Sequence, residues 1–409
     1  MERIIFYIII AIIIFDFVFE RILEYLNVSW RSKQIPTELK GIYDDEKYKK
    51  QQAYSKTNSK FSVITSTVSF ILIIVFLFFD GFALLNNYLS PNIQNELFLG
   101  LSYFGILYLA NDILTLPFSL YDTFVIEQRF GFNKTTVKTY IFDKLKGYLL
   151  TAILGGFLYS VLFKLYESTG AYFWILCWGV IAFFMIFFSM FYSNIIVPLF
   201  NKQKPLSNSN LKDAISQFSK KVGFKLDNIY EIDGSKRSTR ANAYFTGLGP
   251  KKRIVLYDTL LNELNDDEIV AVLAHEIGHY KKKHTLTSIV LSVIQMGIMF
   301  YILSLFISNP LLANALGVPN AFFHISLIAF ALLYSPISTI TGLFMNTLSR
   351  KNEYEADNFV RENGNPDFLV SALKKLSTNN LSNLTPHPAY VWVNYSHPTL
   401  LQRIKAISI

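Results

Sequence analysis

The chain has 409 residues, 52% of them hydrophobic and 16% aromatic, with a mean hydropathy of +0.32. This composition excludes an ordinary soluble globular protein and is typical of an integral membrane protein in contact with the lipid bilayer. The net charge of +8 comes from basic residues spread along the chain, so no nucleic acid is expected as a partner. Cys177 is the lone cysteine, which excludes an intrachain disulfide.

Seven apolar runs are long enough to cross a bilayer as helices, which takes about 17 to 25 residues. They span residues 4–26, 61–85, 97–116, 148–165, 172–197, 286–307 and 321–348. The first run has no small-residue cleavage site before its charged end, so we interpret it as a retained span rather than a signal peptide. The runs predict a mainly α-helical integral membrane fold with seven transmembrane helices.

The distribution of Lys and Arg predicts how these helices are oriented. Short cytoplasmic loops carry an excess of basic residues. The segments after the first, third and fifth runs and the tail after the seventh are basic, whereas residues 86–96 and 309–320 contain no Lys or Arg. We therefore expect the N-terminus outside and the C-terminus in the cytoplasm.

Two polar stretches on the expected cytoplasmic side are large enough to fold. The chain then divides into 1–197 with runs one to five, 198–284, 285–348 with runs six and seven, and 349–409. The last part is expected to be mostly helical, with an interruption at the prolines of "LTPHPAY".

The sequence pattern of residues 198–284 predicts a helix, then a β-hairpin, then a second helix. "LKDAISQFSKKVGF" (211–224) has helical apolar spacing, and "NAYFTG" and "RIVLYD" are predicted strands joined by a turn at 247–250. Asn265 followed by Glu268 predicts a capping box at the start of the second helix.

That second helix carries the sequence His-Glu-x-x-His. His275 and His279 lie four residues apart, so both imidazoles share one helical face and can bind one metal ion, with Glu276 as general base toward water. The alternative is that the two histidines are ordinary surface residues. Ala274, Ile277 and Gly278 around them argue against an exposed face.

A catalytic zinc site needs a third ligand, and "RKNEYEADNF" (350–359) contains the best candidate. Glu353 and Asp357 share a helical face, whereas Glu355 is expected to point elsewhere; the alternative is a solvated acidic helix. The motif precedes run six and Glu353 follows run seven, each by roughly 10 Å of helix, so both emerge on one side at similar height. We therefore expect the motif helix to continue the sixth span and to hold the metal near the membrane surface.

Several further segments resemble one family. "PFSLYDTFVIEQRFGFN", "SKRSTRANAYFTG", "KKRIVLYDTLL", "HEIGHYKKKH", "EYEAD" and "YSHPTLLQRI" occur in the order seen in the type I CAAX prenyl proteases, which are integral-membrane zinc metalloproteases related to HtpX-type proteases. The resemblance implies seven spans ringing a chamber and a cytoplasmic zincin-like domain with a small β-sheet. Polar residues within the runs, such as Asp112 and Gln295, fit either a wet cavity or helix–helix contacts.

The resemblance also implies roles for residues of this chain. One Zn²⁺ per chain is bound by His275, His279 and Glu353, with Glu276 as catalytic base and Asp357 supporting a ligand histidine. His397 is a catalytic residue that stabilises the oxyanion. Substrate-binding residues are Asn242, beside an edge strand, and Arg403, which binds a substrate carboxylate or pairs with an acid such as Asp357. The histidines at 284 and 324 are interpreted as structural, and His387, in "TPHPAY", could be confused with His397.

The expected activity is therefore that of a membrane zinc endopeptidase that processes CAAX-type C-termini of prenylated peptides. Two alternatives remain: a quality-control protease that cuts unmodified membrane proteins, and a nonenzymatic transporter with a vestigial motif. Richness in Ile, Lys and Asn suggests a bacterial chain, so the bacterial inner membrane is the preferred location and the ER membrane the alternative.

Overall fold

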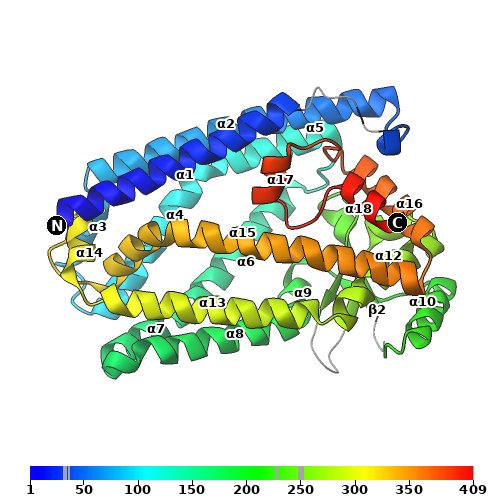
Figure 1. Cartoon of the computed structure of the whole chain (residues 1–409). Helices are drawn as coiled ribbons and strands as arrows, with labels where there is room; N and C mark the ends of the chain where they lie inside the picture. Colours follow the sequence, from blue (N-terminus) through cyan, green and yellow to red (C-terminus); the bar gives the residue numbers. More distant parts are fainter. Residues whose placement is uncertain (31–34, 36, 226–228, 247–252, 409) are drawn as a thin grey trace.

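The structure is a computed structural model that describes residues 1–30, 35, 37–225, 229–246 and 253–408. Long helices lie side by side over most of its length, and a smaller part with a β-sheet and short helices lies at one end (Figure 1). The long helices are α1 Glu2–Trp30, α2 Asp45–Phe78, α4 Glu96–Tyr121, α6 Val137–Leu150, α7 Gly156–Thr169, α8 Phe173–Ile195, α13 His284–Phe306 and α15 Phe323–Asn363. The fold is mainly helical, as predicted.

Five stretches of the described residues are long and apolar enough to cross a membrane: Asp45–Phe78, Glu96–Phe130, Val137–Phe200, His284–Phe306 and Phe323–Asn363. Six of the seven predicted runs overlap these stretches, and the fourth and fifth share Val137–Phe200; the second run, 61–85, extends past the end of α2 at Phe78 into α3, Gly81–Leu89. The first run lies in α1, which is not among the five and carries Asp16, Glu20 and Arg21.

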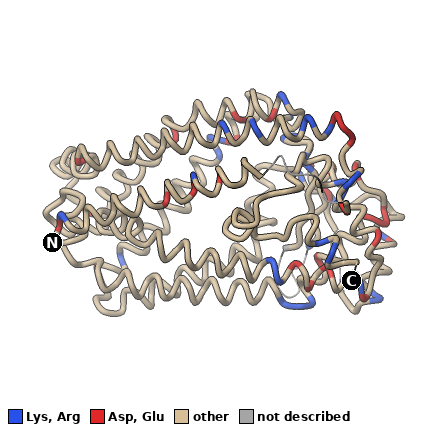
Figure 2. Tube along the Cα trace, turned by 45° about the horizontal axis from the view of Figure 1, so that its top comes forward, with Lys and Arg blue, Asp and Glu red and all other residues tan. Residues whose placement is uncertain are grey.

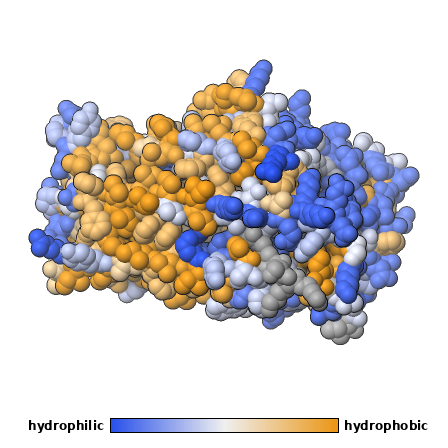
Figure 3. All heavy atoms as spheres, turned by 90° about the horizontal axis from the view of Figure 1, so that it is seen from above, coloured by the Kyte–Doolittle hydropathy of each residue, from blue (hydrophilic) through white to orange (hydrophobic). Residues whose placement is uncertain are grey.

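The surface separates into an apolar and a polar end. Figure 3 shows an apolar surface over the long helices. Figure 2 shows that charged residues gather at the other end of the molecule, where the β-sheet lies. Large apolar side chains such as Ile113, Phe183 and Ile340 are more than 60% exposed along these helices. Exposure of so much apolar surface to water would be unfavourable, so this surface is suited to contact with lipid.

Some polar side chains within the spans join two helices. Gln295 on α13 donates to Thr341 on α15 at 2.9 Å, and Asp112 on α4 pairs with Lys144 on α6 at 2.5 Å and accepts from Tyr148. These contacts agree with the helix–helix interpretation of polar residues in the runs.

A four-stranded sheet lies at the polar end. Its strands are β1 Gln203–Pro205, β2 Ile229–Ile232, β3 Ala243–Thr246 and β4 Arg253–Tyr257, in the order β1-β2-β4-β3, and only β2 and β4 run parallel. The two strands of the predicted hairpin are confirmed as β3 and β4, and their predicted turn at 247–250 lies outside the described residues. β1 and β2 are too short for their alternation to be visible in the sequence.

Helices cover this sheet and complete the core. The predicted helix at 211–224 is α10 Ser209–Lys221, which buries Leu211 and Ile215 against Ile254 and Leu256 of β4. The C-terminal part is helical as predicted, with α16 Pro366–Asn379, α17 Pro388–Asn394 and α18 Leu400–Ile407.

The motif helix is α12, Asp266–Lys281, and its predicted capping box between Asn265 and Glu268 is present. The expectation that this helix continues the sixth span is wrong. α12 ends at Lys281, Lys283 is left-handed with φ +61°, and α13 begins at His284. Three consecutive lysines cover about 200° of a helix circumference. In a continuous helix, at least one of the three ammonium groups would therefore face the helices packed against it. The break leaves all three exposed.

Glu268 joins α12 to α16 and yields a stability prediction. Its carboxylate is 2% exposed, caps α12, accepts from Ser371 at 2.7 Å and pairs with Lys375 at 2.8 Å. We expect Glu268→Ala to lower the free energy of unfolding by about 2 kcal/mol, since a cap and buried charge-assisted hydrogen bonds are lost. Lys375→Met should cost less than ~1 kcal/mol because Lys375 is 44% exposed. Thermal unfolding in detergent measures both, and equal losses would contradict this ranking.

Candidate metal centre

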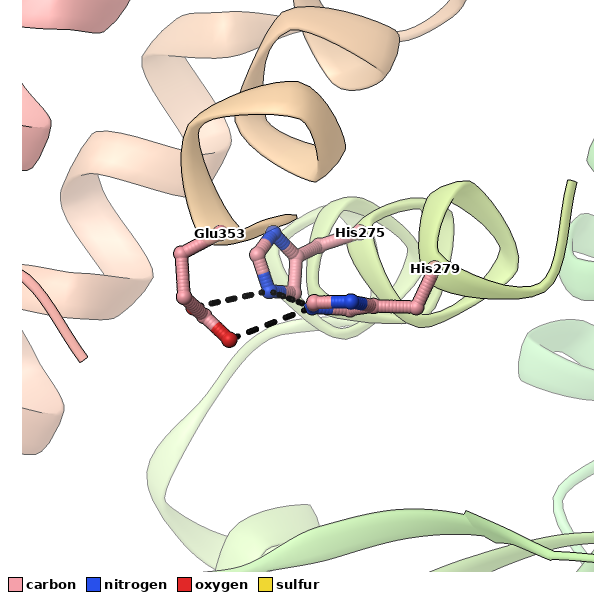
Figure 4. Close-up of side chains that lie close together, drawn as sticks. All are labelled: His275, His279 and Glu353. Atoms are coloured by element: carbon pink, nitrogen blue, oxygen red, sulfur yellow. Dashed lines mark hydrogen bonds and ion pairs between the residues drawn. The ribbon is translucent and has the colours of Figure 1, made fainter. Parts of the chain in front are cut away.

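Three side chains from two helices converge at the polar end (Figure 4). His275 and His279 come from α12 and Glu353 from α15, near the end of that long helix. The two Nε2 atoms are 3.1 Å apart, and oxygens of Glu353 lie 3.4 Å from Nε2 of His275 and 3.2 Å from Nε2 of His279. The structure therefore brings together the three residues predicted as ligands.

A close approach of the two helix backbones places these side chains. A Cβ at Gly278 would lie 3.1 Å from Cβ of Phe359 and 3.2 Å from the Cα and carbonyl oxygen of Ala356. Gly278 is one residue before His279, and Ala356 is one turn after Glu353. The absent side chain at Gly278 thus permits the separation at which one carboxylate reaches both imidazoles.

The donor set fits a divalent metal ion. His275 and Glu353 are 6% and 4% exposed, and Oε2 of Glu353 is buried without a hydrogen-bond partner. A buried carboxylate oxygen that lacks a partner is costly, and a metal ion would satisfy it. Two imidazoles and one carboxylate are a common catalytic metal set.

Protonation of His275 competes with metal binding. Burial alone would lower the pKa of His275, but the neighbouring carboxylates of Asp357 and Glu353 outweigh burial and raise that pKa above its ordinary value. A metal ion must displace this proton, so metal affinity should fall as the pH decreases.

Asp357 and Arg403 support the first histidine. Asp357 accepts from Nδ1 of His275 at 2.9 Å and from Nε and Nη2 of Arg403 at 2.9 and 2.6 Å. Nη1 of Arg403 is also 3.5 Å from Oε2 of Glu353. The structure thus has the second of the two arrangements left open for Arg403, in which it pairs with Asp357.

The other predicted residues lie around this cluster. His397 is 65% exposed, and its Nδ1 is 2.9 Å from Oε1 of Glu353. Glu276 is half-buried, and no described residue holds its carboxylate by a hydrogen bond or ion pair. Asn242 is exposed at the start of β3, where its side chain accepts from the N–H of Ala243. Within the described part of the chain, no hydrogen bond or ion pair joins Asn242 to the three ligand candidates.

Three histidines lie outside the predicted site residues, and two of these, His284 and His324, are interpreted as structural from the sequence. His387 caps α17 by accepting from the N–H of Ala389 at 3.1 Å, and His324 bonds Asn86 within the helix bundle at 3.0 Å. The third, His284, instead contacts His279, and Glu355 contacts His284. Sequence reasoning missed this pair because the helix break that brings His284 back is not visible in residue spacing.

The close approach at Gly278 predicts a specific sensitivity. We expect Gly278→Ala to cost about 1–3 kcal/mol by overpacking and to weaken metal binding on the order of tenfold, because α12 and α15 must separate. The matched control is Gly342→Ala in α15, where an added Cβ meets nothing within 4 Å. Chelator competition measures both affinities, and equal values for the two variants would contradict the argument.

Comparisons with known proteins agree with this arrangement. Residues 24–202 match the family described as CAAX prenyl protease N-terminal, five membrane helices, and residues 205–409 match Peptidase family M48. The chain is 34% identical to CAAX prenyl protease 1 homolog of Arabidopsis thaliana over 98% of this chain and 96% of that protein. It is 31% identical to CAAX prenyl protease 1 homolog of Homo sapiens over 91% and 88%.

A solved structure is also similar over nearly its whole length. The crystal structure of S. mikatae Ste24p superposes with a TM-score of 0.94 at 33% identity and covers 99% of each chain. Together with the apolar helices and the His/Glu cluster, these matches show that the chain belongs to peptidase family M48 and is an integral-membrane metalloendopeptidase of the CAAX prenyl protease type.

Proposed function

We propose that the chain binds one zinc ion through His275, His279 and Glu353 and cleaves peptide bonds near a lipidated C-terminal cysteine. The observation that carries the metal assignment is the spacing of the ligand atoms. Tetrahedral zinc with bonds of about 2.0–2.1 Å separates its ligand atoms by about 3.3 Å. The three separations at this site are 3.1, 3.2 and 3.4 Å.

The surrounding residues have the chemistry that peptide hydrolysis requires. When bound, zinc supplies a Lewis acid that polarises the scissile carbonyl and acidifies a water molecule. Glu276, beside the first ligand, takes the proton of the attacking water and passes it to the leaving amine. His397 is exposed enough to turn toward the substrate and donate to the carbonyl oxygen as negative charge develops there. Arg403 and Asp357 hold the ring of His275.

An edge strand and a cavity support an extended, partly apolar substrate. β3 is the last strand in the sheet order, so a peptide can pair with its free edge beside Asn242. A cavity of about 690 Å³ adjoins this edge and includes Asn242, Tyr244 and aromatic residues of α8 such as Phe188 and Tyr192. Thr285 lines both this cavity and the pocket beside His279. An apolar group attached near the scissile bond fits this aromatic lining.

We further propose seven membrane crossings, with α1 and each of α7 and α8 crossing separately, around a chamber. The protease part comprises 198–284 and 349–409 and faces the cytoplasm, in accord with the basic loops of that side. The bacterial inner membrane is the preferred location and the ER membrane the alternative.

The base assignment is tested by replacing Glu276. We expect Glu276→Gln to lower kcat by at least ~10²-fold, because an amide cannot accept the proton, while the zinc content per chain stays that of the parent. Peptide cleavage and metal analysis of the same preparation measure the two quantities. Full activity would refute the base role. If Glu276→Gln also loses its zinc, the loss of activity no longer tests the base role. A nonenzymatic transporter would bind no zinc in either the parent or the variant.

The substrate class is tested with two peptides of one sequence, prenylated and unprenylated. If the aromatic cavity takes the lipid, burial of a few methylene groups at about 0.8 kcal/mol each raises kcat/KM by tenfold or more. Equal kcat/KM values would favour the quality-control alternative, in which unmodified segments are cut.

A further inference from the structure

The second ligand candidate, His279, contacts another imidazole on the side away from Glu353. Its Nδ1 lies 3.0 Å from Nδ1 of His284, and the two rings meet nearly edge to face at 74°. Nε2 of His284 in turn lies 3.1 Å from Oε2 of Glu355. His284 is 6% exposed and is the first residue of α13, so this ring has a defined place in the fold.

Donor and acceptor roles along this chain of contacts follow from the metal site. His279 can bind a metal through Nε2 only if the lone pair is there, which puts its ring proton on Nδ1. That N–H must be accepted by an unprotonated Nδ1 of His284. The proton of His284 is then on Nε2, from which it donates to the carboxylate of Glu355.

We propose that His284 and Glu355 are positioning residues that hold His279 in its metal-binding tautomer and orientation. This inference rests on the proposed metal site but concerns metal affinity rather than substrate. His275 has the direct version of the same support, since its Nδ1 donates to Asp357 at 2.9 Å. His279 is instead linked to the carboxylate of Glu355 through the ring of His284.

The break between α12 and α13 makes this relay possible. In a continuous helix, a residue five positions after His279 would lie about 140° around the axis, away from the ligand face. The left-handed Lys283 interrupts the helix, and His284, the next residue, contacts His279. Glu355 points away from Glu353 around α15 and reaches His284 on α13 instead of the three-ligand cluster.

The experiment measures Zn²⁺ affinity of the full chain in detergent by competition with a chelator. His284→Phe retains an aromatic ring but removes the acceptor, and we expect the Kd for Zn²⁺ to rise about 10–100-fold. His284→Gln should restore binding to within a few-fold of the parent, because its amide can accept from His279 and donate to Glu355. A role in folding alone predicts no such rescue.

Two controls separate the relay from general damage. His324→Phe replaces another buried histidine, one that bonds Asn86 and does not contact the ligand candidates, and it should leave the Kd unchanged. Glu355→Leu should weaken binding, and the double variant with His284→Phe should be no weaker than His284→Phe alone, because both act through one path.

A Kd for His284→Phe within threefold of the parent, or additive losses in the double variant, would overturn the proposal. If His284→Phe fails to fold, the affinities of His284→Gln and Glu355→Leu decide it: a loss only in Glu355→Leu supports the relay, and no loss in either refutes it. Failure of this inference leaves Glu276→Gln as a separate test of the hydrolytic mechanism.

Discussion

The close packing of α12 on α15 is the constraint on which the site depends. Neither helix carries a complete metal site, because two imidazoles from one helix leave a third ligand to be supplied across an interface. Contact between Gly278 and the backbone of Ala356 brings the helices near enough for Glu353 to reach both imidazoles. A methyl group at this contact would move the carboxylate by a few tenths of an ångström, which is significant on the scale of a metal–ligand bond.

Electrostatic balance explains why the residues around the ligands are charged. Glu353 and Asp357 are both nearly fully buried one helical turn apart, and two buried carboxylates repel each other unless positive charge is close. Arg403 supplies one positive charge to Asp357 and lies 3.5 Å from Glu353. A divalent ion would supply the rest. The site is therefore assembled as one unit in which each buried charge depends on its neighbours.

The membrane and the reaction place opposite demands on adjacent segments. α13 is apolar over most of its length, while α12 must present polar groups to a substrate and to water. Three exposed lysines, the last of which is the left-handed Lys283, separate these two segments. Directly after this break His284 contacts His279, so the first residue of α13 belongs to the polar cluster.

Local information was sufficient to predict much of this protein. Apolar run length indicated spans, because the bilayer thickness sets helix length. Two local features were predictable from the sequence: the shared helical face of His275 and His279, and the capping box at Asn265. Both depend only on contacts within about one helix turn. Two apolar runs separate the motif from Glu353, which predicted that Glu353 and the two histidines would meet at one end of the helices, and the structure brings them together there.

Contacts between distant segments were decided only by tertiary structure. The pairing of Arg403 with Asp357, the parallel pairing of β2 with β4, the break before His284 and the contact of His284 with Glu355 all join elements whose approach residue spacing does not encode. Side chains on one helix turn are positioned by the helix itself. Those on different elements are positioned by the packing of the whole chain, and that packing is a collective property of the sequence.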